Sequence, residues 1–171
     1  RILTGIEVDI LEDGSLDQDE GLLADLDVVV ASVHSKLSME SAAMTRRMIA
    51  AVENPHTDIL GHCTGRIIVG RGRKQSSFDS ARVFAACAAT GTAVEINSRP
   101  ERRDPPAELL SEAVGAGCLF TIDTDAHAPG QLEWQWMGCE QAAESSVPVE
   151  RVANTWPLER FLEWTGSHAR S

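Results

Sequence analysis

The scarcity of several residue classes narrows what this chain can be. Its 171 residues include no tyrosine and only 5% aromatic residues, and 26 acidic residues outnumber 15 lysines and arginines to give a net charge of −11. So acidic a surface argues against sequence-independent binding of nucleic acid over the whole molecule. A local basic cluster is nevertheless present, at Arg66, Arg71, Arg73 and Lys74.

Long apolar runs and closely spaced cysteines are also missing. No run approaches the roughly 20 residues that a membrane-spanning helix needs, and no stretch has the pattern of a signal peptide. The four cysteines (Cys63, Cys87, Cys118 and Cys139) are scattered without a Cys-x-x-Cys spacing. We interpret them as reduced, mostly buried thiols, and we expect a cytoplasmic protein of one domain.

What the chain does contain is a repeated pairing of apolar runs with polar ends. Strand-like runs end at Glu7, His34, His62, Glu95 and the pair Asp125 and His127. Successive positions lie 27 to 33 residues apart, close to the roughly 30 residues of one strand–helix–strand unit. The pattern predicts parallel strands that bring these side chains to one end of a sheet. Residues two apart on an extended backbone point to one side, so Asp125 and His127 can reach one site.

Helix-like segments lie between the strands. We predict helices over 39–52, 78–90, 106–116 and 131–144, and one or two short helices within 148–164. Alternation of strands and helices predicts an α/β fold with a parallel sheet covered on both faces. Because five strands would each supply a polar group at the same end, a barrel is favoured over a doubly wound sheet with a single switch point.

The chain enters its first strand at once, through Arg1-Ile2-Leu3-Thr4-Gly5, without an initiator methionine. Five strands do not close a barrel that usually takes about eight. We therefore expect residues 1–171 to be the C-terminal portion of a longer polypeptide.

Three imidazoles interspersed with carboxylates form a candidate metal site at Glu7, His34, His62, Asp125 and His127. Such donors suit manganese or zinc, with iron as a further candidate. A single histidine or glutamate at a strand end is more often structural, and only the shared spacing of all five favours metal binding. His56 precedes a strand and His168 lies in what we expect to be a frayed C-terminus, so neither is assigned to the site.

Three further residues have alternative interpretations. Glu95 or Asn97 could face the site and orient a ligand or a water molecule. Arg66, four residues after His62, could clamp a substrate phosphate or be a solvated loop arginine. Arg71, Arg73 and Lys74 are interpreted as solvated loop residues.

Several motifs together resemble the PHP (polymerase and histidinol phosphatase) domain, in the form attached to bacterial family X DNA polymerases. The resemblance covers nearly the whole chain. Its motifs are Gly-Ile-Glu-Val-Asp, Ala-Ser-Val-His-Ser, Asp-Ile-Leu-Gly-His-Cys-Thr-Gly-Arg, Glu-Ile-Asn, Thr-Asp-Ala-His and Asn-Thr-Trp-Pro-Leu-Glu-Arg. It implies a distorted seven-stranded (β/α) barrel with up to three divalent metal ions that hydrolyses phosphoesters.

By this resemblance, Glu7 is similar to a carboxylate that bridges two metals, and His34 and His62 to the other ligands of one of them. Asp125 and His127 are similar to the late ligands of the remaining two. Glu7, Asp125 and His127 are the expected catalytic residues, and Arg66 and Asn97 the expected substrate contacts. The family's opening His-x-His motif is not in this sequence, so we expect residues 1–171 either to fold only together with the missing N-terminal segment or to bind one metal well and the others poorly.

The function implied is that of a metal-dependent phosphoesterase. Its substrate would be a DNA 3′ end, as in an exonuclease of DNA repair, or a small phosphomonoester. The alternative is a non-catalytic PHP module that serves as a structural or docking domain beside a polymerase or a DNA-binding segment. If the metal assignment holds, Glu7, His34 and His62 must converge in the folded protein.

Overall fold

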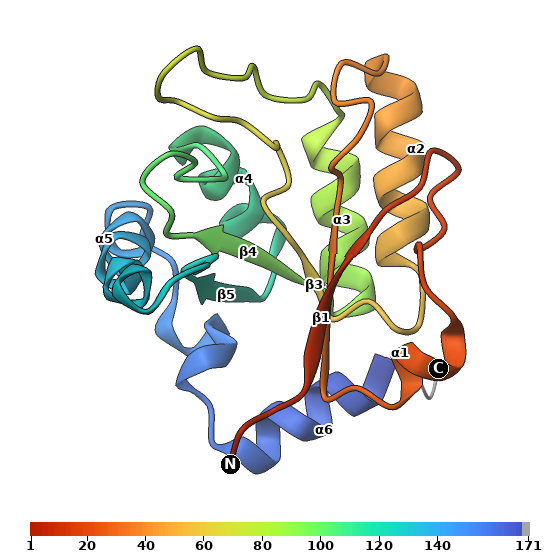
Figure 1. Cartoon of the computed structure of the whole chain (residues 1–171), viewed down its shortest axis with the longest axis vertical. Helices are drawn as coiled ribbons and strands as arrows, with labels where there is room; N and C mark the ends of the chain where they lie inside the picture. Colours follow the sequence, from red (N-terminus) through yellow and green to blue (C-terminus); the bar gives the residue numbers. More distant parts are fainter. Residues whose placement is uncertain (169–171) are drawn as a thin grey trace.

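A computed structural model describes residues 1–168 of the chain (Figure 1). Five parallel strands form one sheet in the order in which they occur: β1 (Gly5–Asp9), β2 (Val28–Ser32), β3 (Ile59–Leu60), β4 (Ala93–Asn97) and β5 (Phe120–Asp123). The parallel α/β architecture is confirmed, and the arrangement is compatible with part of a barrel. Closure into a seven-stranded barrel stays a prediction.

The helices predicted over 39–52, 78–90 and 106–116 are confirmed, each to within two residues of the observed bounds. The segments between strands are α1 (Glu20–Ala24), α2 (Ser41–Val52), α3 (Ser80–Thr90) and α4 (Ala107–Ala116). After β5 follow the 3₁₀ helix η1 (Pro129–Trp134), α5 (Gln135–Glu144), the short η2 (Val149–Arg151) and η3 (Ala153–Thr155), and α6 (Leu158–His168). The helix predicted over 131–144 is therefore divided, and α1 was not predicted. Among residues 1–168, no helix combines the length and apolarity needed to cross a membrane.

Alternate residues of β4 and β5 separate an apolar face from a polar one. Val94 and Ile96 of β4 pair in register with Phe120 and Ile122 of β5, and all four belong to the hydrophobic core. Figure 1 shows α2, α3 and α4 side by side along the sheet, and Met44, Phe84 and Leu110 of these helices belong to the same core.

The opposite face of β4 and β5 carries polar side chains that are nevertheless buried. Glu95 pairs in register with Thr121, and Asn97 with Asp123. Glu95, Asn97 and Thr121 are each at most 5% exposed. Burying polar groups costs free energy unless they are hydrogen-bonded. Buried titratable side chains are common at functional sites, so we expect a functional site on this face.

His168 does not lie in a frayed terminus, and that expectation was wrong. It is the last residue of α6 and is buried, with its Nδ1 2.8 Å from Asp58 Oδ1. Trp164 Nε1, one turn earlier, donates to the Gly91 carbonyl oxygen at 2.8 Å. These two bonds fix α6 against the segments that precede β3 and β4.

Arg47 of α2 ties the ends of the first two strands together. Its side chain is 1% exposed, and its guanidinium donates to the carbonyl oxygens of Leu11 (2.8 Å), Ser35 (2.9 Å) and Ile10. Leu11 and Ser35 follow β1 and β2, so the arginine crosslinks the two segments that follow these strands.

Arg47→Met should lower the free energy of unfolding by about 3 kcal/mol, because it removes the donors to one buried and two partly buried carbonyl oxygens. Urea unfolding followed by circular dichroism measures the change. Arg46→Met is the matched control, since Arg46 is exposed on the same helix and its loss should change stability by less than about 0.5 kcal/mol. Equal effects of the two substitutions would contradict the crosslink.

Candidate metal centre

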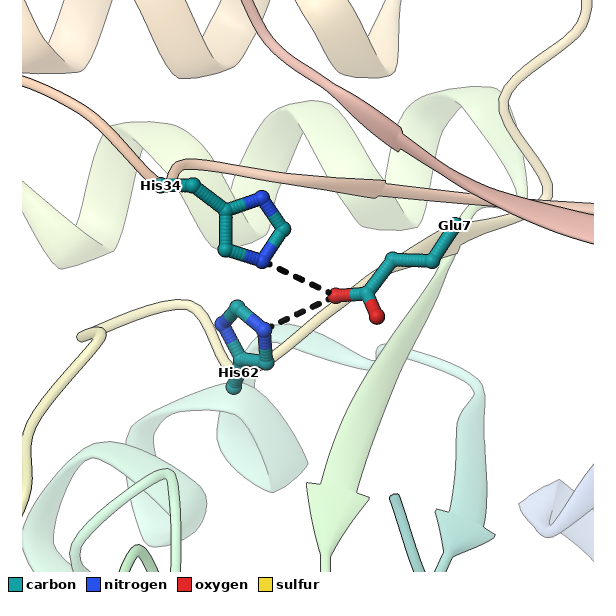
Figure 2. Close-up of side chains that lie close together, drawn as sticks. All are labelled: Glu7, His34 and His62. Atoms are coloured by element: carbon teal, nitrogen blue, oxygen red, sulfur yellow. Dashed lines mark ion pairs between the residues drawn. The ribbon is translucent and has the colours of Figure 1, made fainter. Parts of the chain in front are cut away.

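Glu7, His34 and His62 converge as predicted (Figure 2). Glu7 Oε1 lies 3.3 Å from His34 Nε2 and 2.8 Å from His62 Nε2, and one ligand atom from each residue lies within 4.8 Å of the others. Two imidazole nitrogens and a carboxylate oxygen at this spacing match the donor set of zinc and manganese sites.

The strand order explains this convergence. Glu7 lies on β1, His34 two residues after β2, and His62 two residues after β3, so neighbouring parallel strands deliver all three. Gly61 permits the last approach, because a Cβ atom there would lie 2.2 Å from Ser32 Oγ and 2.8 Å from Val30 Cγ1. A larger residue at position 61 would push the His62 segment away from β2.

Asp9 orients His34, and sequence reasoning missed it. The Asp9 carboxylate oxygen Oδ1 lies 2.5 Å from His34 Nδ1, on the side of the ring opposite Glu7. Metal-binding histidines commonly use their second nitrogen in this way, which fixes the ring and its tautomer. The available signal was the Glu-Val-Asp triplet, since Glu7 and Asp9 lie on the same face of β1.

Glu7 and His34 stabilise each other's charged forms. Hydrogen bonds with His34 and His62 hold the pKa of the Glu7 carboxyl far below its ordinary value, although burial opposes them. The same bond to Glu7 raises the pKa of the His34 imidazole against partial burial, and Asp9 adds to the rise. An anionic Glu7 between two imidazoles fits a divalent cation.

Asp125 and His127 line the same cavity as the three converging residues but do not join their cluster. The cavity has a volume of about 430 Å³ and is lined by Glu7, His34, His62, Ile67, Arg99, Glu101, Arg102, Asp125 and His127. Asp125 has a left-handed backbone with φ of 50°, and β5 ends at Asp123. The extended geometry expected for this pair is therefore wrong, although both residues face one site.

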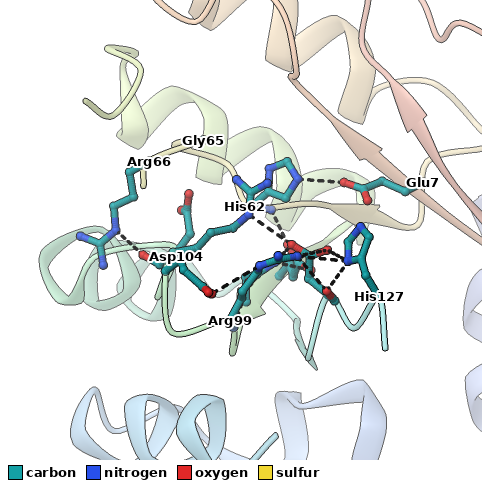
Figure 3. A network of polar contacts seen from close by, with 12 residues as sticks. Glu7, His62, Gly65, Arg66, Arg99, Asp104 and His127 are labelled. Carbon is teal, nitrogen blue, oxygen red and sulfur yellow. Dashed lines mark hydrogen bonds and ion pairs between the residues drawn. The ribbon is translucent and has the colours of Figure 1, made fainter. Parts of the chain in front are cut away.

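Asp125 is paired with arginines from the segment that follows β4. Arg102 Nε lies 3.2 Å from Asp125 Oδ2, and Arg99 Nη1 lies 3.6 Å from Oδ1. Arg99 Nη1 also lies 3.1 Å from His127 Nδ1 (Figure 3). The His127 side chain is 70% exposed, at the mouth of the cavity.

Glu95 and Asn97 lie on one face of β4 and are both buried behind the cavity. Glu95 Oε2 accepts a hydrogen bond from the His62 backbone N–H, and Oε1 accepts one from Asn97 Nδ2 at 3.3 Å. Asn97 Nδ2 is also 3.5 Å from Asp125 Oδ2. Burial raises the pKa of the Glu95 carboxyl well above its ordinary range, and the carboxyl of Asp123 adds to the rise. Both side chains contact site residues, and neither lines the cavity.

The structure places Arg66 away from the cavity. Its Nε donates to the Arg102 carbonyl oxygen at 2.9 Å and its Nη2 donates to that of Arg103, and Figure 3 shows its guanidinium turned away from Glu7. The arginines that line the cavity are Arg99 and Arg102, which sequence reasoning missed. Their signal was the run Arg-Pro-Glu-Arg-Arg shortly after the strand that carries Glu95.

No family model matches the chain. The chain is 36% identical over 166 residues to the DNA polymerase/3′-5′ exonuclease PolX of Bacillus subtilis, an alignment that covers 95% of the chain and 29% of that protein. It is 35% identical to a probable phosphatase of Caldanaerobacter subterraneus, over 91% of the chain and 62% of that protein.

A probable phosphatase of Syntrophotalea carbinolica is 33% identical, over 97% of the chain and 69% of that protein. The chain thus spans between under a third and about two thirds of the length of these relatives. On the strength of these relationships, the chain belongs to the PHP (polymerase and histidinol phosphatase) family and is related to the PHP domain of bacterial family X DNA polymerases.

Proposed function

We propose that this protein is a metal-dependent phosphoesterase. The observation that carries the proposal is the convergence of Glu7, His34 and His62 in a cavity that also holds two arginines. The cavity thus combines ligand atoms for a divalent cation with hydrogen-bond donors for a phosphate. The names of the relatives, an exonuclease and several probable phosphatases, support the same class of reaction.

Glu7, His34 and His62 would hold one divalent ion, manganese or zinc, and Asp125 and His127 would contribute to further ions. When bound, such an ion lowers the pKa of a water molecule and neutralises charge on the phosphoryl oxygens. Asp9 keeps His34 in the tautomer that presents Nε2 to the site. Glu95 holds the His62 backbone N–H and so fixes the position of that ring.

Two substrate classes remain within the proposal. The PolX relative supports a DNA 3′ end, and the phosphatase relatives support a small phosphomonoester. The net charge of −11 favours the smaller substrate, because extended DNA contacts need a positive surface. Hydrolysis of 4-nitrophenyl phosphate, compared with release of nucleotides from a 3′-labelled oligonucleotide, separates the two.

Purified protein should contain at least one equivalent of a transition metal and should hydrolyse 4-nitrophenyl phosphate. The donor geometry at Glu7 is already in place for the first ion. Elemental analysis and a colorimetric assay, each repeated after chelation and readdition of Mn²⁺ or Zn²⁺, measure both properties. Less than one equivalent together with no hydrolysis of either substrate would instead favour a non-catalytic docking module.

His127→Ala should reduce phosphoesterase turnover by roughly 100-fold or more, because it removes a ligand at the mouth of the cavity. Thermal unfolding should be unchanged, since the side chain is largely exposed and its loss opens no internal cavity. His56→Ala, in the loop before β3, is the control and should retain full activity. Unaltered turnover and metal content in His127→Ala would make His127 a structural residue.

Metal affinity at the Glu7 site should fall as the pH is lowered, by up to about tenfold per pH unit for each proton displaced. Metal binding needs a neutral imidazole, and the pKa of His34 lies above the ordinary 6.5, so competition by protons should begin above that pH. Titration calorimetry with Mn²⁺ between pH 5.5 and 8.5 measures the profile.

Asp9→Asn should shift this profile to lower pH, because Asp9 helps to raise the pKa of His34. It should also weaken the plateau affinity about 10- to 100-fold. Asp17→Asn, an exposed change a few residues away, should leave both unchanged. An affinity independent of pH in the unmodified protein would contradict the participation of His34.

A further inference from the structure

Three of the residues that line the cavity, Arg99, Glu101 and Arg102, belong to residues 99–104, the segment that follows β4. This segment is held in place from two sides. Asp104, fully buried, accepts hydrogen bonds from Thr64 Oγ1 (2.7 Å) and Thr64 N (3.2 Å). Gln141 of α5 donates to the Pro105 carbonyl oxygen at 2.6 Å. The segment is therefore anchored both to the loop after β3 and to α5.

Arg66 anchors the same segment a third time, at the backbone of Arg102 and Arg103. It bonds to the carbonyl oxygens of Arg102 and Arg103, so the backbone at Arg102 is fixed while its side chain enters the cavity. An arginine whose backbone is held in this way loses less conformational entropy when it binds a ligand.

The Arg102 side chain has unused hydrogen-bonding capacity. It is 15% exposed, its Nε lies 3.2 Å from Asp125 Oδ2, and its Nη1 is buried with no hydrogen-bond partner among the described residues. A buried guanidinium N–H without a partner is costly. Arg99 is more fully engaged, by Glu101, the Asp125 carbonyl oxygen, His127 and the Trp134 ring.

We infer that Arg102 binds the phosphate group of the substrate and that Asp125 pairs with Arg102 until a cation binds. Guanidinium groups bind phosphate through paired, charge-assisted hydrogen bonds. Asp125 satisfies one edge of Arg102 in the ligand-free protein, so a cation that takes up the Asp125 carboxylate leaves Arg102 free for an anion. Cation and phosphate thus bind with positive coupling. This inference rests on the proposed function, since it concerns the same cavity.

The test measures binding of inorganic phosphate to the whole protein by titration calorimetry, after chelation and again with Mn²⁺. Arg102→Gln should weaken phosphate binding about 10- to 100-fold in the presence of Mn²⁺, and Arg102→Lys should have a smaller effect, because it keeps the charge without the fork. In the chelated protein, Asp125→Asn should strengthen phosphate binding several-fold, since it releases Arg102. These opposite signs distinguish a phosphate site from a structural ion pair.

Arg103→Gln is the matched control, because Arg103 is the next residue and has the same charge. Its guanidinium points to Glu144, 3.9 Å away, and does not line the cavity. The phosphate affinity and the thermal unfolding of the Arg103→Gln variant should equal those of the unmodified protein. Unchanged phosphate affinity in both Arg102 variants, or weaker binding in Asp125→Asn after chelation, would overturn the inference.

Failure of the inference and failure of the proposed function give different results. Arg102-dependent phosphate binding without hydrolysis of any ester would refute the phosphoesterase and leave the phosphate site standing. Hydrolysis of 4-nitrophenyl phosphate with the same KM in Arg102→Gln as in the unmodified protein would refute the phosphate site alone.

Discussion

The candidate site depends on one carboxylate oxygen, Glu7 Oε1, that two imidazoles approach at once. His34 and His62 reach it from neighbouring strands, and no flexible segment could hold three polar side chains within 4.8 Å at little entropic cost. The parallel ladders of β1, β2 and β3 supply the frame, and Arg47 fixes the segments that follow β1 and β2. This frame holds the three ligand atoms close together, and such preorganisation favours tight metal binding.

The cavity brings groups of opposite charge together. Glu7 lines the cavity and is held in its anionic form by His34 and His62, whereas burial raises the pKa of the Glu95 and Asp123 carboxyls on β4 and β5 and so disfavours their charged forms. Arg99 and Arg102 line the same cavity. Under the proposed function a phosphate ester would use both, because a cation held by Glu7 would polarise it while the guanidinium groups neutralise its oxygens. Asp125 pairs with both arginines, and we infer that the cation and anion sites affect each other through this residue.

Spacing along the sequence predicted the residues that strands deliver, and only those. Glu7, His34 and His62 follow the period of strand–helix–strand units, and parallel strands then force them together. Asp125 lies beyond the end of its strand in a left-handed conformation, which the extended pattern could not foresee. His168 was misjudged for a related reason: proximity to a chain end says nothing about burial, and Asp58, far away in sequence, fixes it.

The arginines show a different limit of sequence reasoning. Arg66 stands in a motif beside His62, and sequence proximity suggested that it contacts the substrate. In the fold its guanidinium supports the carbonyl oxygens of the segment that presents Arg102. Thr64, in the same motif, holds Asp104 at the far end of that segment. The motif therefore supports the segment that carries Arg102, and this cavity-lining arginine lies more than thirty positions later in the sequence. Which of two arginines touches a ligand is decided by how neighbouring loops pack, and spacing alone carries no information about that packing.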